Sequence, residues 1–181
     1  MTLVVLIGGA RAGKSALAAQ LAGRFDGPVA VVATAEARDE EMRARIERHR
    51  ARRPAAWTTV EEPLELRQAL AALDDRAFVV IDCLTLWVAN VLERGDAEER
   101  IVAEATAVAA AAAGRAAPVV AVTNEVGLGV VPATPLGRAF RDVLGAVNTA
   151  FVEHADEAAL VVAGRLLQLG PGRRSERWHE Q

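Results

Sequence analysis

The chain has a single lysine and a single cysteine among its 181 residues, and both scarcities are informative. One cysteine, Cys83, excludes an internal disulfide and any metal site built from several cysteines. Its place after an apolar run is typical of a small buried side chain. The sequence has no charged leader followed by an apolar segment, and no apolar run long enough to cross a bilayer. We therefore expect a cytoplasmic protein without a membrane span.

The charge balance is slightly acidic, with 21 basic and 24 acidic residues and a formal net charge of −3. A chain with this charge gives no reason to expect a nucleic-acid partner. The hydrophobic fraction of 52% is ordinary for a globular protein, and the length fits one domain with a sizeable core. We expect that domain to span residues 1–170, followed by a loosely ordered tail over residues 171–181.

A glycine-rich segment directly follows the apolar run at residues 3–7, which predicts a short buried strand. The spacing Gly8-x-x-x-x-Gly13-Lys14-Ser15 is that of a phosphate-binding loop, and residues 16–22 favour the helix that such a loop precedes. Glycines let backbone N–H groups approach phosphate oxygens, and the helix N-terminus adds partial positive charge. The loop residues expected to bind nucleotide are Gly8, Gly9, Ala10, Arg11, Ala12, Gly13, Lys14 and Ser15.

Lys14 is the one lysine of the chain, and every other basic residue is arginine. A compact ammonium group that reaches the β- and γ-phosphates cannot be exchanged for a planar guanidinium. Its retention favours a phosphate-binding loop over the alternative, a plain glycine-rich turn between a strand and a helix. The hydroxyl of Ser15 is then expected to be a ligand of Mg²⁺.

Apolar runs alternate with helical stretches along the rest of the chain. Strands are predicted over residues 28–33, 57–60, 78–81, 118–122 and 158–163, of which the last is the final strand expected. Helices are predicted over residues 36–53, 61–73, 84–92, 97–113 and 136–155. This alternation predicts an α/β fold of the three-layer P-loop NTPase (RecA-like) type, a mostly parallel sheet with helices on both faces. Ligand-binding loops should gather at the carboxyl ends of its strands.

Two residues outside the loop are candidates for chemistry. Asp82 ends an apolar strand, where an acidic residue holds Mg²⁺ in phosphate-loop enzymes, and we favour this role over an exposed strand end. His49 lies among arginines, on one predicted helix face with Met42 and Ile46. A neutral imidazole is a good nucleophile toward phosphorus. A lone histidine on a basic helix is more often a solvated surface residue, so both interpretations of His49 stand.

Polar residues also follow the strand that ends near residue 122. Glu125 could accept the proton of a substrate hydroxyl. Arg138, Arg141 and Asp142 fit two interpretations equally, contacts in a site or salt bridges on a helix face.

Several of these motifs together resemble the bifunctional adenosylcobinamide kinase/adenosylcobinamide-phosphate guanylyltransferase family of cobalamin biosynthesis. The matching segments, from about residue 3 to 165, include Gly-Gly-Ala-Arg-Ala-Gly-Lys-Ser at 8–15, Ala-Thr-Ala at 33–35, Asp-Glu-Glu-Met-Arg-Ala-Arg-Ile at 39–46, Asp-Cys-Leu-Thr at 82–85 and Thr-Asn-Glu-Val-Gly-Leu-Gly-Val-Val-Pro at 123–132.

The resemblance implies two reactions. ATP or GTP phosphorylates the aminopropanol hydroxyl of adenosylcobinamide, a corrinoid. GMP then passes from GTP through a covalent guanylyl-histidine, here His49, to give adenosylcobinamide-GDP and pyrophosphate. The resemblance also implies a homotrimer, and nucleotide contacts beyond the loop at Ala33, Thr34, Ala35, Arg50, Ala51, Arg52, Arg53, Glu61 and Asp82. Two alternatives stand beside it: a small-molecule kinase without guanylyl transfer, and a RecA-like nucleotide-dependent binding module.

Overall fold

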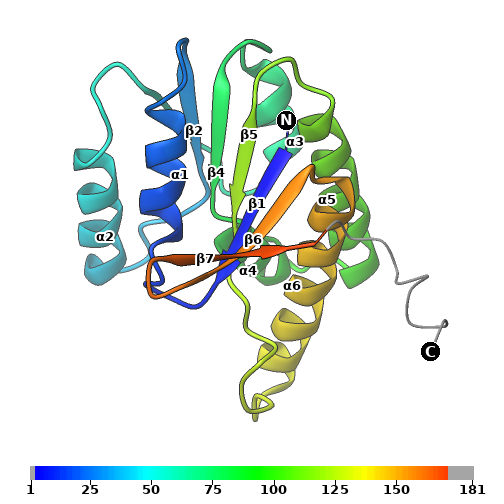
Figure 1. Ribbon diagram of the computed structural model, residues 1–181. Helices are drawn as coiled ribbons and strands as arrows, with labels where there is room; N and C mark the ends of the chain where they lie inside the picture. Colours follow the sequence, from blue (N-terminus) through cyan, green and yellow to red (C-terminus); the bar gives the residue numbers. More distant parts are fainter. Residues whose placement is uncertain (1–2, 171–181) are drawn as a thin grey trace, which may run out of the picture.

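The computed structural model describes residues 3–170, which form a single sheet between two layers of helices (Figure 1). The strand order across the sheet is β3-β2-β4-β5-β1-β6-β7. Strands β1 to β6 run parallel and β7 runs antiparallel to β6, which confirms the predicted α/β fold. The strands are β1 (Leu3–Gly8), β2 (Val29–Ala33), β3 (Thr58–Glu61), β4 (Phe78–Asp82), β5 (Val119–Val122), β6 (Glu157–Val162) and β7 (Arg165–Leu169).

Helix α1 packs on one face of the sheet against β1, β4 and β5, and helices α3 to α6 cover the other face. Helix α2 lies beside α1 at the β2 side of the molecule and has no buried residue (Figure 1). The helices are α1 (Lys14–Ala22), α2 (Glu40–Ala51), α3 (Leu66–Ala72), α4 (Leu84–Arg94), α5 (Glu98–Ala113) and α6 (Pro135–His154). None of the helices within residues 3–170 has the length and hydropathy to cross a bilayer.

Both faces of the sheet are buried, which is why its central strands are continuous apolar runs. In β1, Val4 and Leu6 join the cluster under α1, while Leu3, Val5 and Ile7 join the larger cluster on the other face. This division follows from the alternation of side chains along a strand.

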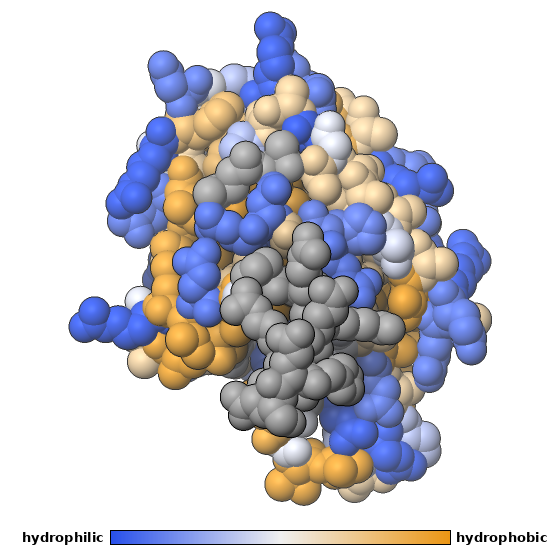
Figure 2. Space-filling view, turned by 45° about the vertical axis from the view of Figure 1, so that its right-hand side comes forward, coloured by the Kyte–Doolittle hydropathy of each residue, from blue (hydrophilic) through white to orange (hydrophobic). Residues whose placement is uncertain are grey.

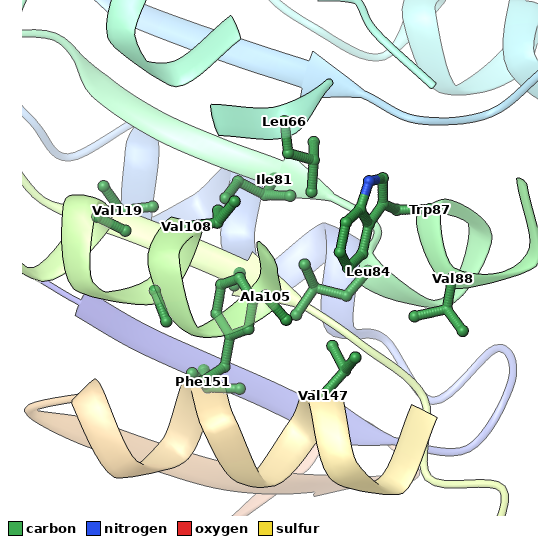
Figure 3. Packing of buried hydrophobic residues seen from close by; sticks show 14 of the residues in the cluster. Leu66, Ile81, Leu84, Trp87, Val88, Ala105, Val108, Val119, Val147 and Phe151 are labelled. Carbon is green, nitrogen blue, oxygen red and sulfur yellow. The ribbon is translucent and has the colours of Figure 1, made fainter. Parts of the chain in front are cut away.

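Trp87 of α4 and Phe151 of α6 are the largest fully buried side chains of the opposite face (Figure 3). The indole nitrogen of Trp87 donates a hydrogen bond of 2.8 Å to the Leu64 carbonyl, so its polar end is satisfied as well.

Two helices begin later than the sequence predicts, because side chains cap the backbone ahead of them. Helix α2 begins at residue 40 instead of 36, since the Asp39 carboxylate accepts a hydrogen bond of 2.7 Å from the backbone nitrogen of Met42. Helix α3 begins at residue 66 instead of 61. The Glu62 carboxylate there accepts from the backbone nitrogens of Leu64 and Glu65, and so stabilises a turn.

The expectation that the strand near residues 158–163 would be the last was wrong, because β7 follows it. Ala163 and Gly164 both have positive φ and make the tight turn between β6 and β7. Strand β7 lies at the edge of the sheet, and most of its residues are exposed. Because it has no buried face, its sequence lacks the alternation of apolar and polar residues that predicts a strand. The predicted tail, residues 171–181, lies outside the described residues.

Candidate active site

A cavity of about 510 Å³ opens at the carboxyl ends of β1, β2, β4 and β5, the lower edge of the sheet in Figure 1. This volume is in the range of small-molecule sites. The strand order brings together the loops that the sequence places at one edge. Of the predicted site residues, those that line the cavity are Ala10, Arg11, Ala12, Gly13, Lys14, Ser15, Ala33, Ala35, His49, Arg50, Arg52, Arg53, Glu61 and Asp82.

Four predicted residues do not line the cavity: Gly8, Gly9, Thr34 and Ala51. Thr34 has no exposed surface, and its hydroxyl lies 2.7 Å from the carbonyl oxygen and 2.8 Å from the backbone nitrogen of Cys83. It therefore ties the end of β2 to the residue after β4. The partly buried Cys83 packs against the cluster under α1, and burial raises the pKa of its thiol.

The loop between β1 and α1 has the backbone of an anion-binding turn. Two residues of the turn have a left-handed backbone conformation: Arg11, with φ 58°, and Gly13, which directly precedes α1, with φ 103°. Alternation of this kind points successive N–H groups to one side, at a helix N-terminus. The Ala12 carbonyl accepts a hydrogen bond of 2.9 Å from the backbone nitrogen of Gly164, which ties the loop to the β6–β7 turn.

The Lys14 side chain folds back over its own loop. Its ammonium nitrogen donates hydrogen bonds of 2.9 Å to the Gly8 carbonyl and 2.7 Å to the Gly9 carbonyl, and only 6% of the residue is exposed. Burial lowers the pKa of Lys14 below that of a free lysine, although the charges of Cys83 and Asp82 oppose the shift. The ammonium group is therefore fixed at the centre of the loop.

The Ser15 hydroxyl donates a hydrogen bond of 3.0 Å to Oδ1 of Asp82, and joins the first turn of α1 to the end of β4. The other carboxylate oxygen, Oδ2, lies 3.6 Å from Nδ1 of His49 and 3.8 Å from a terminal nitrogen of Arg53. Burial raises the pKa of Asp82, but His49, Ser15 and Arg53 outweigh burial and place the pKa below that of a free aspartate. Asp82 is consequently an anion at neutral pH.

Helix α2 presents its less exposed face to this carboxylate. Met42, Ile46 and His49 are half-buried and line the cavity, as their spacing along the helix predicts. Arg53, after the helix, donates a hydrogen bond of 3.3 Å to the Thr59 hydroxyl on β3. Arg50 lies 3.4 Å from the Glu61 carboxylate. Helix α2 is thus positioned by polar contacts at the cavity and contributes no buried side chain.

The cavity lining also includes polar residues outside the predicted site set, namely Glu41, Arg45, Arg48, Thr59 and Asn124. Arg45 lies one turn before His49, and that spacing could have identified it. Asn124 follows β5, the strand between β1 and β4, but its position depends on sheet order. The backbone nitrogen of Asn124 donates a hydrogen bond of 2.8 Å to the Thr85 hydroxyl. Its carbonyl oxygen accepts a hydrogen bond of 3.0 Å from the Asn148 side chain.

The other polar candidates lie outside this cavity lining. The Glu125 carboxylate accepts a hydrogen bond of 2.6 Å from the Gly127 backbone nitrogen. Arg138 donates to two carbonyls of residues 132–133, and so holds the loop before α6. Arg141 and Asp142 form a salt bridge of 2.8 Å on the surface of α6, which matches the second of their two interpretations.

The donor set of the cavity fits a magnesium ion. Ser15 and Asp82 present two oxygens 3.0 Å apart at the end of the phosphate-binding loop. Among the described residues no group of three or more His, Cys, Asp or Glu side chains is arranged to hold a metal ion by itself. Mg²⁺ prefers hard oxygen ligands, and in nucleotide sites it takes few of them from the protein and the rest from phosphate and water.

Several known proteins are similar in sequence to this chain. The family model described as cobinamide kinase / cobinamide phosphate guanyltransferase matches residues 4–169. A bifunctional adenosylcobalamin biosynthesis protein of Pseudomonas aeruginosa is 41% identical over 161 residues, 88% of this chain and 92% of its own. Similarly named proteins of Escherichia coli and Salmonella typhimurium are each 40% identical over 90% of this chain and 96% of their own. A type III secretion ATPase aligns with a TM-score of 0.46 and 12% identity, too remote to bear on function.

Proposed function

Since this chain belongs to the cobinamide kinase / cobinamide phosphate guanyltransferase family, we propose that it carries out both reactions in the one cavity described above. The observation that carries the proposal is a continuous set of contacts, from Ser15 through the Asp82 carboxylate to the His49 ring. A phosphate-binding loop and a nucleophilic imidazole thereby share one triphosphate site. Family membership favours this function over a kinase without guanylyl transfer and over a nucleotide-dependent binding module.

In the kinase reaction, the aminopropanol hydroxyl oxygen of adenosylcobinamide attacks the γ-phosphorus of ATP or GTP and releases its proton to water. The bond from that phosphorus to the bridging oxygen breaks, and the nucleoside diphosphate leaves. The loop N–H groups and the Lys14 ammonium balance the charge on the transferred group and its leaving oxygen. Ser15 and Asp82 would hold Mg²⁺, which would neutralise phosphate charge when bound.

In the guanylyl transfer, His49 attacks the α-phosphorus of GTP and pyrophosphate leaves. The phosphate of adenosylcobinamide phosphate then attacks the same phosphorus, and the histidine leaves. Direct attack of that phosphate on GTP would bring two anions together, and a neutral imidazole avoids the repulsion. Further contacts with the nucleotide are proposed for the predicted residues that line the cavity, Ala33, Ala35, Arg50, Arg52, Arg53 and Glu61, but not for the buried Thr34 or for Ala51.

The test is labelling of the enzyme with GTP that carries ³²P at the α-phosphate. Wild type should acquire an acid-labile, base-stable label and pass it to adenosylcobinamide phosphate. His49→Ala should lose the label and guanylyl transfer, yet still phosphorylate adenosylcobinamide, because the loop is unchanged. The matched control is His154→Ala. The His154 ring nitrogen Nδ1 lies 2.9 Å from the Ala150 carbonyl on α6, outside the cavity lining, so this variant should label normally.

A labelled His49→Ala would overturn the assignment of the nucleophile. Loss of the kinase reaction in the same variant would show that His49 serves both reactions, and would overturn the division of roles. An unlabelled wild type that still phosphorylates adenosylcobinamide would favour the kinase without guanylyl transfer.

We also propose a cytoplasmic homotrimer. The segment before α6 and the first turn of that helix support association, because they carry exposed apolar side chains: Leu128, Val130, Val131 and Leu136. This segment projects from the lower end of the molecule, where orange side chains gather in Figure 2. Contiguous exposed apolar side chains are typical of interaction surfaces. A monomeric mass by light scattering at micromolar concentration would contradict the trimer.

A further inference from the structure

The Asp82 carboxylate divides its two oxygens between two functional side chains. Oδ1 accepts the hydrogen bond from the Ser15 hydroxyl, and Oδ2 faces Nδ1 of His49 at 3.6 Å. The serine belongs to the phosphate-binding loop and the histidine to α2, so one strand end serves both elements. The ring nitrogen turned to the carboxylate is therefore Nδ1, and Nε2 is the other nitrogen of the ring.

We propose that Asp82 is the positioning residue for guanylyl transfer: it holds a proton on Nδ1 of His49 and leaves the lone pair on Nε2 as the nucleophile. This inference rests on the proposed function, in which His49 attacks GTP. An ionised carboxylate only accepts hydrogen bonds, so it favours the ring form with the proton on the facing nitrogen. Carboxylates fix the ring form and orientation of histidines in this way in metal sites and in hydrolases.

The separation of 3.6 Å is longer than a hydrogen bond. Catalytic contacts of this kind tighten when the substrate binds. At either separation the carboxylate repels a lone pair on Nδ1 and attracts a proton there. The choice of ring form therefore does not depend on a short contact.

Asp82 is well placed to orient another residue because its own position is fixed. Its backbone pairs with Ala33 of β2 on one side and with Val122 of β5 on the other. Arg53 adds a positive charge 3.8 Å from Oδ2, which favours the ionised carboxylate. Helix α2, in contrast, has no buried residue.

The chemistry balances without a further reactant. The Nε2 lone pair forms the bond to the α-phosphorus of GTP, and the bond to the bridging oxygen breaks as pyrophosphate takes its electron pair. The ring keeps its Nδ1 proton and gains one positive charge, which the Asp82 carboxylate stabilises. When the phosphate of adenosylcobinamide phosphate attacks, the N–P bond breaks, its electrons return to Nε2, and the ring is neutral again.

The test measures the ¹⁵N chemical shifts of the His49 ring nitrogens in protein without metal or nucleotide. The shifts are followed toward high pH until they stop changing, and the limiting values report which nitrogen carries the proton. His49→Ala identifies the His49 signals among the three histidines of the chain. We expect wild type to carry the proton on Nδ1, and Asp82→Ala to move it toward Nε2.

Ser15→Ala is the matched control, because it removes the other partner of the same carboxylate and should leave the wild-type ring form in place. If Asp82→Ala does not unfold cooperatively, Asp82→Leu replaces it, since leucine keeps the branched shape and accepts no hydrogen bond. A wild-type ring protonated on Nε2 would overturn the proposal. So would an Asp82→Ala or Asp82→Leu protein whose ring form is unchanged.

Labelling with α-³²P GTP supplies the second readout. Asp82→Ala should label His49 about 10–100-fold more slowly than wild type, and Asp82→Glu should recover part of that loss because it keeps a carboxylate. If His49 of the wild type is labelled but the protonated nitrogen of its ring stays the same when Asp82 is replaced, only this inference fails. If wild type does not label His49 at all, the proposed function fails with it.

Discussion

Gly8 lies opposite Val161 in the parallel ladder between β1 and β6, so close that a Cβ on Gly8 would stand 2.2 Å from the Val161 carbonyl oxygen. The first glycine of the phosphate-binding loop therefore allows two backbones to approach. Its neighbour Gly9 differs, since a Cβ there would meet no heavy atom within 4 Å.

Gly8→Ala should lower the free energy of unfolding by about 2–4 kcal/mol, because the added methyl group forces β1 and β6 apart. Gly9→Ala, the matched control, should stay within about 0.5 kcal/mol of wild type. Urea unfolding of the two variants measures the difference. Equal stability of the two would show that the β1–β6 contact does not require glycine at residue 8.

Lys14→Arg should abolish nucleotide binding or weaken it severely, and should reduce both activities by about 100-fold or more, although the charge is kept. The ammonium nitrogen sits 2.9 and 2.7 Å from two loop carbonyls, and a longer planar guanidinium does not fit that position. Nucleotide titration calorimetry and turnover assays measure the effect. Arg24→Lys, at an exposed position outside the cavity lining, should leave both unchanged. Near-normal turnover in Lys14→Arg would refute the role of the loop in phosphoryl transfer.

Arg115→Met should destabilise the protein by about 2–4 kcal/mol, with little effect on nucleotide affinity. Arg115 is 7% exposed, and its guanidinium donates to the carbonyls of Leu70, Asp74 and Ala77 at 3.1, 2.5 and 3.4 Å. Methionine fills similar space but leaves these carbonyls without that donor. Thermal unfolding should show a lower midpoint for Arg115→Met than for the exposed control Arg76→Met. Matching midpoints would mean that water replaces the guanidinium at little cost.

Asp96→Asn should reduce stability at neutral pH, and the reduction should disappear in acid. The hydrogen bonds and charge of Arg94 hold the pKa of Asp96 below its usual range, against a smaller opposing effect of burial. A carboxylate with a lowered pKa in the folded state stabilises that state above its unfolded pKa, about 3.9, and loses the contribution as the pH falls through the lower folded value. Unfolding of both proteins from pH 7 to pH 3 measures this. A difference that stays constant below pH 4 would exclude the ion pair as its source.

The sequence reveals the phosphate-binding loop and the parallel fold because both are local properties. Glycine spacing, one retained lysine and continuous apolar runs need no knowledge of distant contacts. Strand β7 escapes such reasoning, since an exposed edge strand takes its structure from pairing with β6 rather than from burial. The starts of α2 and α3 escape it too, because side chains that cap the preceding backbone decide where each helix begins.

The sequence by itself determined the chemistry available: a phosphate-binding loop, a carboxylate at a strand end, and a histidine on a basic helix. Only the tertiary structure decided that Asp82 lies within 3.0 Å of the Ser15 hydroxyl and 3.6 Å of the His49 ring. The physical reason is sheet order. Strands β4 and β1 are separated by β5, which comes later in the chain, so the meeting of these residues depends on pairings between distant segments. Asn124, in a loop that the sequence places at this edge of the sheet, lines the cavity, whereas Thr34 is buried and does not.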